Sequence, residues 1–146
     1  MNKILIVGLG SIGVRHVKNI LACFSNTEII IYSKRTKIPA EIKKNDNIII
    51  FDSLQKCLKE QPNIGFITNE SAFHVPTAIK LAKNGIDLFI EKPLSDSSRG
   101  INELKKYIKK NKLITQIGCN FRFFPPIKKI KSLIDAKKLA ELFQYK

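Results

Sequence analysis

Three glycines near the start of the chain have a spacing that suits phosphate binding. Gly8, Gly10 and Gly13 lie in the segment ILIVGLGSIGVRH, after an apolar run and before an amphipathic stretch. Gly8 allows a tight turn, Gly10 lets the backbone approach a pyrophosphate, and Gly13 allows the next helix to pack closely on the strand. The free N–H groups that begin that helix attract phosphate. The spacing predicts a dinucleotide-binding turn; a purely structural turn is the alternative.

The residues after the second apolar run bear on the choice of dinucleotide. NAD is usually held there by an acid about twenty residues beyond the glycines, which binds the ribose hydroxyls. This chain has Ser33, Lys34 and Arg35 instead. A hydroxyl and two cations suit a 2′-phosphate, so the sequence favours NADP over NAD. NAD stays the alternative, because two basic residues carry little information in a lysine-rich chain.

Polar residues cluster after the fourth apolar run, in FITNESAFHVP. Thr68, Asn69, Ser71 and His74 lie between a predicted strand and a predicted helix. In a doubly wound sheet the ligand lies beyond the carboxyl ends of the strands, where these residues belong. A surface histidine in the first turn of a helix is an equal alternative for His74.

The fifth apolar run ends on a carboxylate, an ammonium and a proline, in DLFIEKPLS. Glu91, Lys92 and Pro93 would project into the crevice at the same edge of the sheet. A buried lysine there can have its pKa lowered enough to share a proton with a substrate hydroxyl or carbonyl. Pro93 would fix the turn through a cis Lys–Pro bond. An exposed salt bridge after a strand is the alternative.

The elements that must position these residues are short apolar runs alternating with amphipathic segments. The predicted strands are Lys3–Val7, Glu28–Tyr32, Ile48–Phe51, Ile64–Ile67, Asp87–Ile90 and Ile114–Gly118. The predicted helices are Ile12–Phe24, Ser53–Glu60, Ala72–Asn84 and Arg99–Asn111. Continuous apolar strands indicate a sheet covered on both faces. The alternation predicts an α/β fold with a doubly wound parallel sheet of the Rossmann type.

The remaining segments are polar or basic. Residues 34–47 form a connection to which no element is assigned, and Ser95–Ser98 offers N-caps for the helix that follows. A basic amphipathic helix is predicted over residues 127–134, and 142–145 could begin a further strand. We therefore divide the chain into a dinucleotide-binding domain, 1–122, and a linker helix with the start of a truncated second domain, 123–146.

Composition narrows the class of protein. A chain of 146 residues with 44% hydrophobic residues is the size of one domain. Its three cysteines are far apart and match neither a disulfide framework nor a metal site. No apolar run reaches the roughly 18 residues of a transmembrane helix. We expect a cytoplasmic protein with no metal and no membrane partner.

The net charge of +14 raises the question of nucleic-acid binding. Arginine, the residue that grips bases and phosphates bidentately, supplies only four of the 26 basic residues. The lysines read as a solvated surface, so we predict no nucleic-acid partner. The stretch 105–138 is an exception, with eleven basic residues against Asp135 alone. It could face an acidic partner domain or a phosphorylated ligand.

The motifs GLGSIGVRH, TNESAFH, GIDLFIEKPLS and GCNFRFFP, in this order, resemble the glucose–fructose oxidoreductase / inositol dehydrogenase / MocA family of NAD(P)-dependent oxidoreductases. The resemblance runs from Met1 to about Ile134. It implies hydride transfer to or from a sugar- or cyclitol-like hydroxyl or carbonyl, with Lys92 as the active-site lysine. The cofactor-binding residues that it implies are Gly8, Gly10, Ser11, Ile12, Gly13, Asn69, His74, Glu91, Asn120 and Arg122, to which the sequence adds Ser33, Lys34, Arg35 and Thr68.

The chain departs from this family in three ways. Glu70 stands where a proline is common, the acid after the second strand is missing, and the family's C-terminal α/β domain is expected to be lacking. That domain forms the substrate pocket in the family and supplies an acid/base histidine. The isolated chain is therefore expected to bind cofactor with little or no turnover.

Two other functions remain open on the sequence. A dinucleotide-sensing domain would use the same glycines without chemistry and would tolerate Lys92→Ala. A basic nucleic-acid-binding protein would lose affinity steeply with salt and ignore the dinucleotide. A homo-oligomer is compatible with either enzyme or sensor.

Overall fold

The computed structural model describes residues 2–35 and 37–137. Its centre is one sheet of six parallel strands in the order β3-β2-β1-β4-β5-β6. The strands are β1 (Asn2–Val7), β2 (Thr27–Tyr32), β3 (Ile48–Phe51), β4 (Ile64–Ile67), β5 (Asp87–Ile90) and β6 (Thr115–Ile117). The strand order reverses between β1 and β4, which confirms the predicted doubly wound Rossmann fold.

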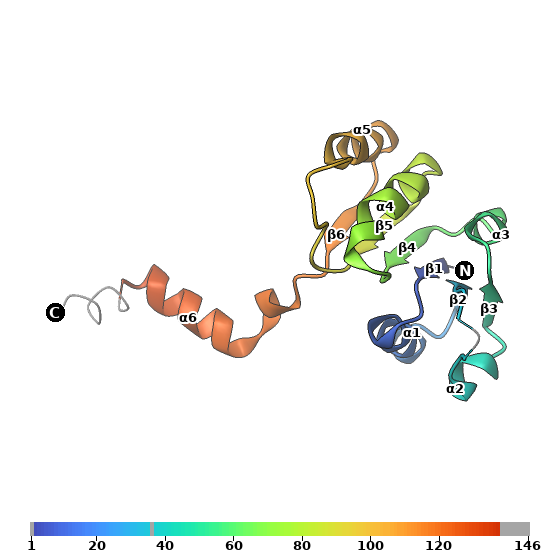
Figure 1. The fold of residues 1–146 in the computed structure, drawn as a ribbon. Helices are drawn as coiled ribbons and strands as arrows, with labels where there is room; N and C mark the ends of the chain where they lie inside the picture. The colour runs from blue at the N-terminus through green and yellow to red at the C-terminus, as the bar shows by residue number, and fades with distance from the viewer. Residues whose placement is uncertain (1, 36, 138–146) are drawn as a thin grey trace.

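Helices cover the two faces of the sheet unequally (Figure 1). One core cluster joins a face of the sheet to α3 (Leu54–Lys59), α4 (His74–Lys83) and α5 (Ile101–Asn111). The other joins the opposite face to α1 (Ser11–Cys23) and α2 (Ala40–Lys43). The apolar runs pack against helices on both sides, as the sequence predicts, and Leu5, Ile6 and Ile30 are fully buried.

Some helix boundaries differ from the sequence prediction. The segment expected to be helical from Ala72 begins instead with the 3₁₀ turn η1 (Ser71–Phe73), and α4 follows it. The expected caps at Ser95–Ser98 are wrong, because Gly100 with φ of +82° caps α5. The connection 34–47 contains the four-residue α2, which is too short to leave a periodic pattern.

The predicted basic helix is present as α6 (Pro125–Asp135), which follows the 3₁₀ turn η2 (Asn120–Phe123). It extends away from the sheet in Figure 1, and Ile127, Ile130 and Ile134 on it are exposed. The strand expected at 142–145 lies outside the described residues. In the described part of the chain, no helix is long and apolar enough to cross a membrane.

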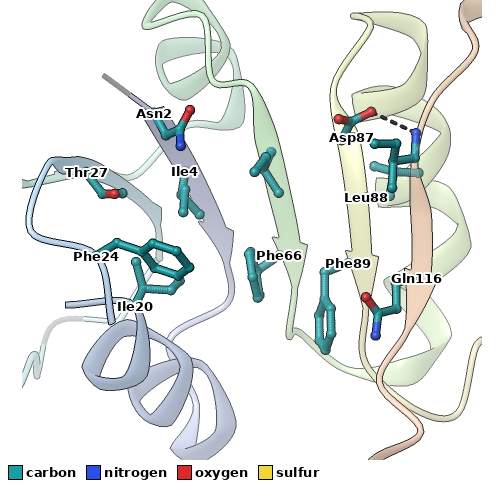
Figure 2. Close-up of a pocket in the computed structure, with 12 residues that line it drawn as sticks. Asn2, Ile4, Ile20, Phe24, Thr27, Phe66, Asp87, Leu88, Phe89 and Gln116 are labelled. Atoms are coloured by element: carbon teal, nitrogen blue, oxygen red, sulfur yellow. Dashed lines mark hydrogen bonds between the residues drawn. The ribbon is translucent and has the colours of Figure 1, made fainter. Parts of the chain in front are cut away.

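An apolar pocket of about 310 Å³ lies on the α1 side of the sheet (Figure 2). Phe24 and Ile20 border it at one end, and Phe66 and Phe89 project into it from β4 and β5. It also includes Asn2, Thr27 and Asp87, each the first residue of a strand. The pocket is therefore centred toward the amino ends of the strands, away from the carboxyl edge where a cofactor would be held.

The three cysteines differ in chemical access, which gives a prediction. Cys57 is fully buried in α3, and this burial raises the pKa of its thiol to about 11, whereas Cys23 and Cys119 are exposed. Because the thiolate is the reactive form, iodoacetamide near neutral pH should label Cys23 and Cys119 but spare Cys57. Mass spectrometry of the native and the urea-unfolded chain tests this. Equal labelling of all three in the native chain would contradict the buried environment of Cys57.

Candidate functional site

The glycine turn lies where β1 ends, at the point where the strand order reverses. Gly8 has φ of +98°, which favours glycine, and its N–H donates to the Tyr32 carbonyl at 3.1 Å. A Cβ on Gly13 would lie 2.2 Å from the Gly8 carbonyl oxygen. This contact is far inside van der Waals distance, so α1 approaches β1 as closely as it does because residue 13 is a glycine.

The head of α1 has the properties of an anion site. Gly10 is the N-cap and the first intrahelical bond runs from the Val14 N–H, which leaves the N–H groups of Ser11, Ile12 and Gly13 without a partner in the helix. No acidic side chain lies in this first turn to offset the positive end of the helix. These donors and this dipole suit a pyrophosphate.

Gly10 faces open space. A Cβ built on it would have one described atom within 4 Å, a guanidinium nitrogen of Arg35 at 4.0 Å. The backbone conformation of Gly10, with φ of −77° and ψ of −173°, is accessible to any residue. The fold therefore requires a glycine at position 13 but not at position 10. The remaining reason for a glycine at position 10 is that a ligand must approach the backbone.

The segment after β2 brings one of its two cations to the glycine turn. Ser33 is buried, and its hydroxyl oxygen accepts the Arg35 N–H at 3.1 Å, which bends the chain at the end of the strand. Both cations are exposed, and the Arg35 guanidinium lies beside Gly10. A hydroxyl-stabilised turn and one guanidinium thus border the head of α1.

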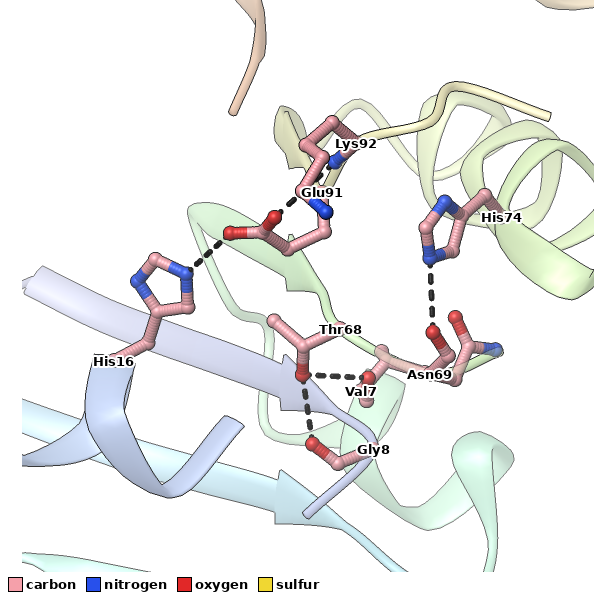
Figure 3. Close-up of polar contacts among 8 residues, drawn as sticks. All are labelled: Val7, Gly8, His16, Thr68, Asn69, His74, Glu91 and Lys92. Carbon is pink, nitrogen blue, oxygen red and sulfur yellow. Dashed lines mark hydrogen bonds and ion pairs between the residues drawn. The ribbon is translucent and has the colours of Figure 1, made fainter. Parts of the chain in front are cut away.

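Thr68 lies behind the glycine turn. Its buried hydroxyl lies 3.1 Å from the Val7 carbonyl and 2.7 Å from the Gly8 carbonyl, and it donates its single proton to these two acceptors (Figure 3). The Thr68 side chain thus stabilises the turn from the protein side.

Asn69 follows Thr68 at the edge of the sheet. Its amide nitrogen donates to Thr77 Oγ1 at 3.3 Å, while its buried Oδ1 has no hydrogen-bond partner among the described residues. An acceptor in this state is costly unless a ligand or solvent reaches it. The orphaned oxygen, together with the open space at Gly10 and the free N–H groups of α1, fits a bound dinucleotide.

His74 is buried, so the alternative of a surface histidine is wrong. Its Nδ1 lies 2.8 Å from the Pro93 carbonyl oxygen and its Nε2 2.9 Å from the Asn69 carbonyl oxygen. Figure 3 shows the second of these contacts. His74 therefore ties the loop after β4 to the loop after β5.

Glu91 and Lys92 follow β5 and differ in exposure. The Lys92–Pro93 peptide bond is cis, as predicted. Lys92 is exposed, so the expectation of a buried lysine is wrong for this chain. Glu91 is largely enclosed, and His16 on α1 donates to its carboxylate at 2.8 Å (Figure 3). The sequence places His16 beside the glycine turn but contains no signal of this pairing, which spans 75 residues.

Asn120 and Arg122 lie on η2, one turn beyond β6, and both are exposed. Gly118, which precedes them, packs against the Glu91 carboxylate. Within residues 2–35 and 37–137, no group of three His, Cys, Asp or Glu side chains could hold a metal ion.

The sheet order, the glycine turn and the open head of α1 define a dinucleotide-binding Rossmann domain. The family model described as "Oxidoreductase family, NAD-binding Rossmann fold" (GFO_IDH_MocA) matches residues 2–119. The chain therefore belongs to this oxidoreductase family, which confirms the resemblance inferred from its motifs.

Curated relatives and solved structures agree with this assignment. The chain is 28% identical to scyllo-inositol 2-dehydrogenase (NAD(+)) of Bacillus subtilis over 144 residues, which are 97% of this chain and 42% of that protein. It is 27% identical to scyllo-inositol dehydrogenase from Lactobacillus casei, solved with NAD(H) and scyllo-inositol, with a TM-score of 0.78 over 94% of this chain and 42% of that one. Myo-inositol 2-dehydrogenase from Lactobacillus plantarum shares the fold, with a TM-score of 0.80 at 22% identity, over 94% of this chain and 42% of that one. The chain thus spans less than half the length of these relatives.

Proposed function

We propose that this chain is the cofactor-binding part of an NAD(P)-dependent oxidoreductase that acts on a hydroxyl or carbonyl of a sugar- or cyclitol-like substrate. The observation that carries the proposal is the head of α1, where free N–H groups adjoin an open Gly10. Family membership and the substrates in the names of the relatives support the reaction class.

The proposed cofactor site is formed by residues from several loops of the chain. The proposed cofactor-binding residues are Gly8, Gly10, Ser11, Ile12, Gly13, Ser33, Lys34, Arg35, Thr68, Asn69, His74, Glu91, Asn120 and Arg122. Thr68 and His74 would contribute indirectly, by fixing the loops that border the cofactor, because their side chains already bond to backbone carbonyls of those loops. When bound, the nicotinamide ring supplies the hydride acceptor or donor.

Lys92 is the proposed catalytic residue. It follows β5 at the carboxyl edge of the sheet, and its side chain is free to extend into the space beyond the strands. Its ammonium group would donate a hydrogen bond to the reacting oxygen of the substrate and polarise it. Hydride transfer needs reactants held in a closed site, so the exposure of Lys92 agrees with binding but little turnover by the isolated chain.

The proposed preference for NADP(H) rests on Arg35. Its guanidinium beside Gly10 could form charge-assisted hydrogen bonds with a 2′-phosphate, and the adjacent Ser33 turn holds its backbone. The names of the Bacillus subtilis and Lactobacillus casei relatives specify NAD(+) and NAD(H), so a direct comparison of the two cofactors is decisive.

Arg35→Ala should weaken NADPH binding about 10- to 100-fold, because a hydrogen bond to a charged group contributes about 1.5–3 kcal/mol. NADH affinity should change less than about threefold, since NADH has no 2′-phosphate for the guanidinium to bind. Calorimetric titration of the purified chain with each cofactor measures both. Lys37→Ala, which removes an exposed cation on the same connection, is the matched control.

The titration separates the two parts of the proposal. Equal losses of NADPH and NADH affinity in the Arg35 variant would contradict the NADP preference. Absence of binding of either cofactor to the wild-type chain would contradict the cofactor-binding role itself.

A further inference from the structure

We propose that His16 and Glu91 form a clamp that positions Lys92. The role of the clamp in catalysis rests on the proposed function of Lys92. The contacts that form the clamp do not depend on that proposal. Three contacts of the Glu91 carboxylate support the inference. They are made to His16 on α1, to the backbone of Lys92 and to Gly118 just beyond β6.

The first contact joins α1 to the end of β5. His16 Nε2 lies 2.8 Å from Glu91 Oε1, and their side chains are only 16% and 13% exposed. A carboxylate only accepts hydrogen bonds, so Nε2 carries the proton and donates it. A hydrogen bond to a charged group in this enclosed position is stronger than one between neutral groups on the surface.

The second contact holds the backbone of the lysine. Glu91 Oε2 accepts the Lys92 N–H at 3.1 Å, so both carboxylate oxygens are engaged, one by the imidazole and one by the next residue (Figure 3). The carboxylate thereby limits rotation at the peptide that precedes the Lys92 side chain. Removing His16 would leave Glu91 free to turn away and release that N–H.

The third contact closes the space around the carboxylate. A Cβ on Gly118, just beyond β6, would lie 3.1 Å from Glu91 Oε1 and 3.2 Å from Oε2. The carboxylate therefore packs against the backbone that leaves β6. With α1 on one side and this backbone on another, Glu91 is oriented toward the protein.

The imidazole is itself held in place by aromatic rings. The His16 ring centroid lies 5.3 Å from that of Phe66 and 5.1 Å from that of Phe89, and these two phenyl rings stack at 4.8 Å. Such packing fixes the ring plane without competing for its N–H groups. His16 is also less than two turns from Gly10, so the helix that begins at the phosphate site also positions the lysine.

The test compares His16→Phe, which keeps an aromatic ring but removes the donor, with Glu91→Gln, which keeps the shape but loses the charge. The exchange rate of the Lys92 amide with water, measured by NMR without cofactor, should rise about 10-fold in each variant, because the opened state becomes more populated. The double variant should show no further rise, since the two residues act as one unit. The Leu88 amide, bonded to the Ile114 carbonyl in the sheet, is the internal reference, and Asn19→Ala on the exposed side of α1 is the control.

Cofactor titration of the same variants separates positioning from direct binding. NADPH and NADH affinities should change less than about threefold in His16→Phe, which corresponds to less than about half of the ~1.4 kcal/mol that a tenfold change represents. An unchanged Lys92 exchange rate in both variants would overturn the clamp. A tenfold affinity loss in His16→Phe would overturn the positioning role and place the pair in the cofactor site itself. Wild-type chain that binds neither cofactor would overturn the proposed function, yet the exchange measurement would still decide the clamp.

Discussion

Gly13→Ala is expected to lower the free energy of unfolding by about 3 kcal/mol, at the upper end of the cost of overpacking a closely packed site. The added Cβ would lie 2.2 Å from the Gly8 carbonyl oxygen and 3.0 Å from Thr68 Oγ1. A carbonyl in the backbone of a turn cannot move aside as the end of a flexible side chain can. Helix α1 must therefore shift away from β1, which opens the core around Val17 and Ile20. Urea unfolding followed by circular dichroism, without cofactor, measures the loss.

Gly10→Ala is the matched control, because it makes the same change three residues away in open space. We expect it to lower stability by only about 1 kcal/mol, the cost of replacing the N-cap glycine by alanine. If Gly13→Ala fails to accumulate as folded protein while Gly10→Ala does, the expected difference is confirmed by that contrast. Equal stability of the two variants would contradict the close approach of α1 to β1.

The strands were predictable because a strand that is buried on both faces consists of a continuous run of apolar residues. The bounds of β3, β4 and β5 agree with the continuous apolar runs, and β1 and β2 begin one residue earlier than predicted. Helix starts were less predictable. The polar run 95–98 matches the chemistry of N-caps, yet the helix starts after Gly100, because its left-handed conformation, and not a side-chain oxygen, ends the loop.

The candidate site divides in the same way. The G-x-G-x-x-G spacing is typical of one strand–turn–helix geometry. The roles of Gly8 and Gly13 could therefore be predicted from the sequence. The orientation of Glu91 depends on His16, on another element, and no local pattern encodes such a contact. The exposure of Lys92 is likewise a tertiary property, set by what lies beyond the carboxyl edge of the sheet.

Gly10→Val is expected to weaken cofactor binding at least about 100-fold while leaving the fold intact, a loss of about 2.7 kcal/mol in binding free energy. The isopropyl group would occupy the open space over the head of α1, where a pyrophosphate must approach the backbone N–H groups. Valine adopts the backbone conformation of Gly10 without strain, and the single atom within 4 Å of the added Cβ belongs to the flexible Arg35 side chain. The thermal midpoint should therefore stay close to that of the wild-type chain.

Calorimetric titration with NADPH and NADH, alongside thermal unfolding, checks both halves of this expectation. Asn19→Ala, exposed on the same helix, is the control for nonspecific effects on α1. A graded loss from glycine through alanine to valine would indicate that the added volume excludes the ligand. Wild-type affinity in Gly10→Val would make the glycine turn purely structural, since Gly13 alone explains the close packing. Gly13→Ala is expected to perturb the fold, whereas Gly10→Val is expected to perturb only the ligand site. The two variants together therefore distinguish close helix packing from ligand approach as reasons for glycine in this motif.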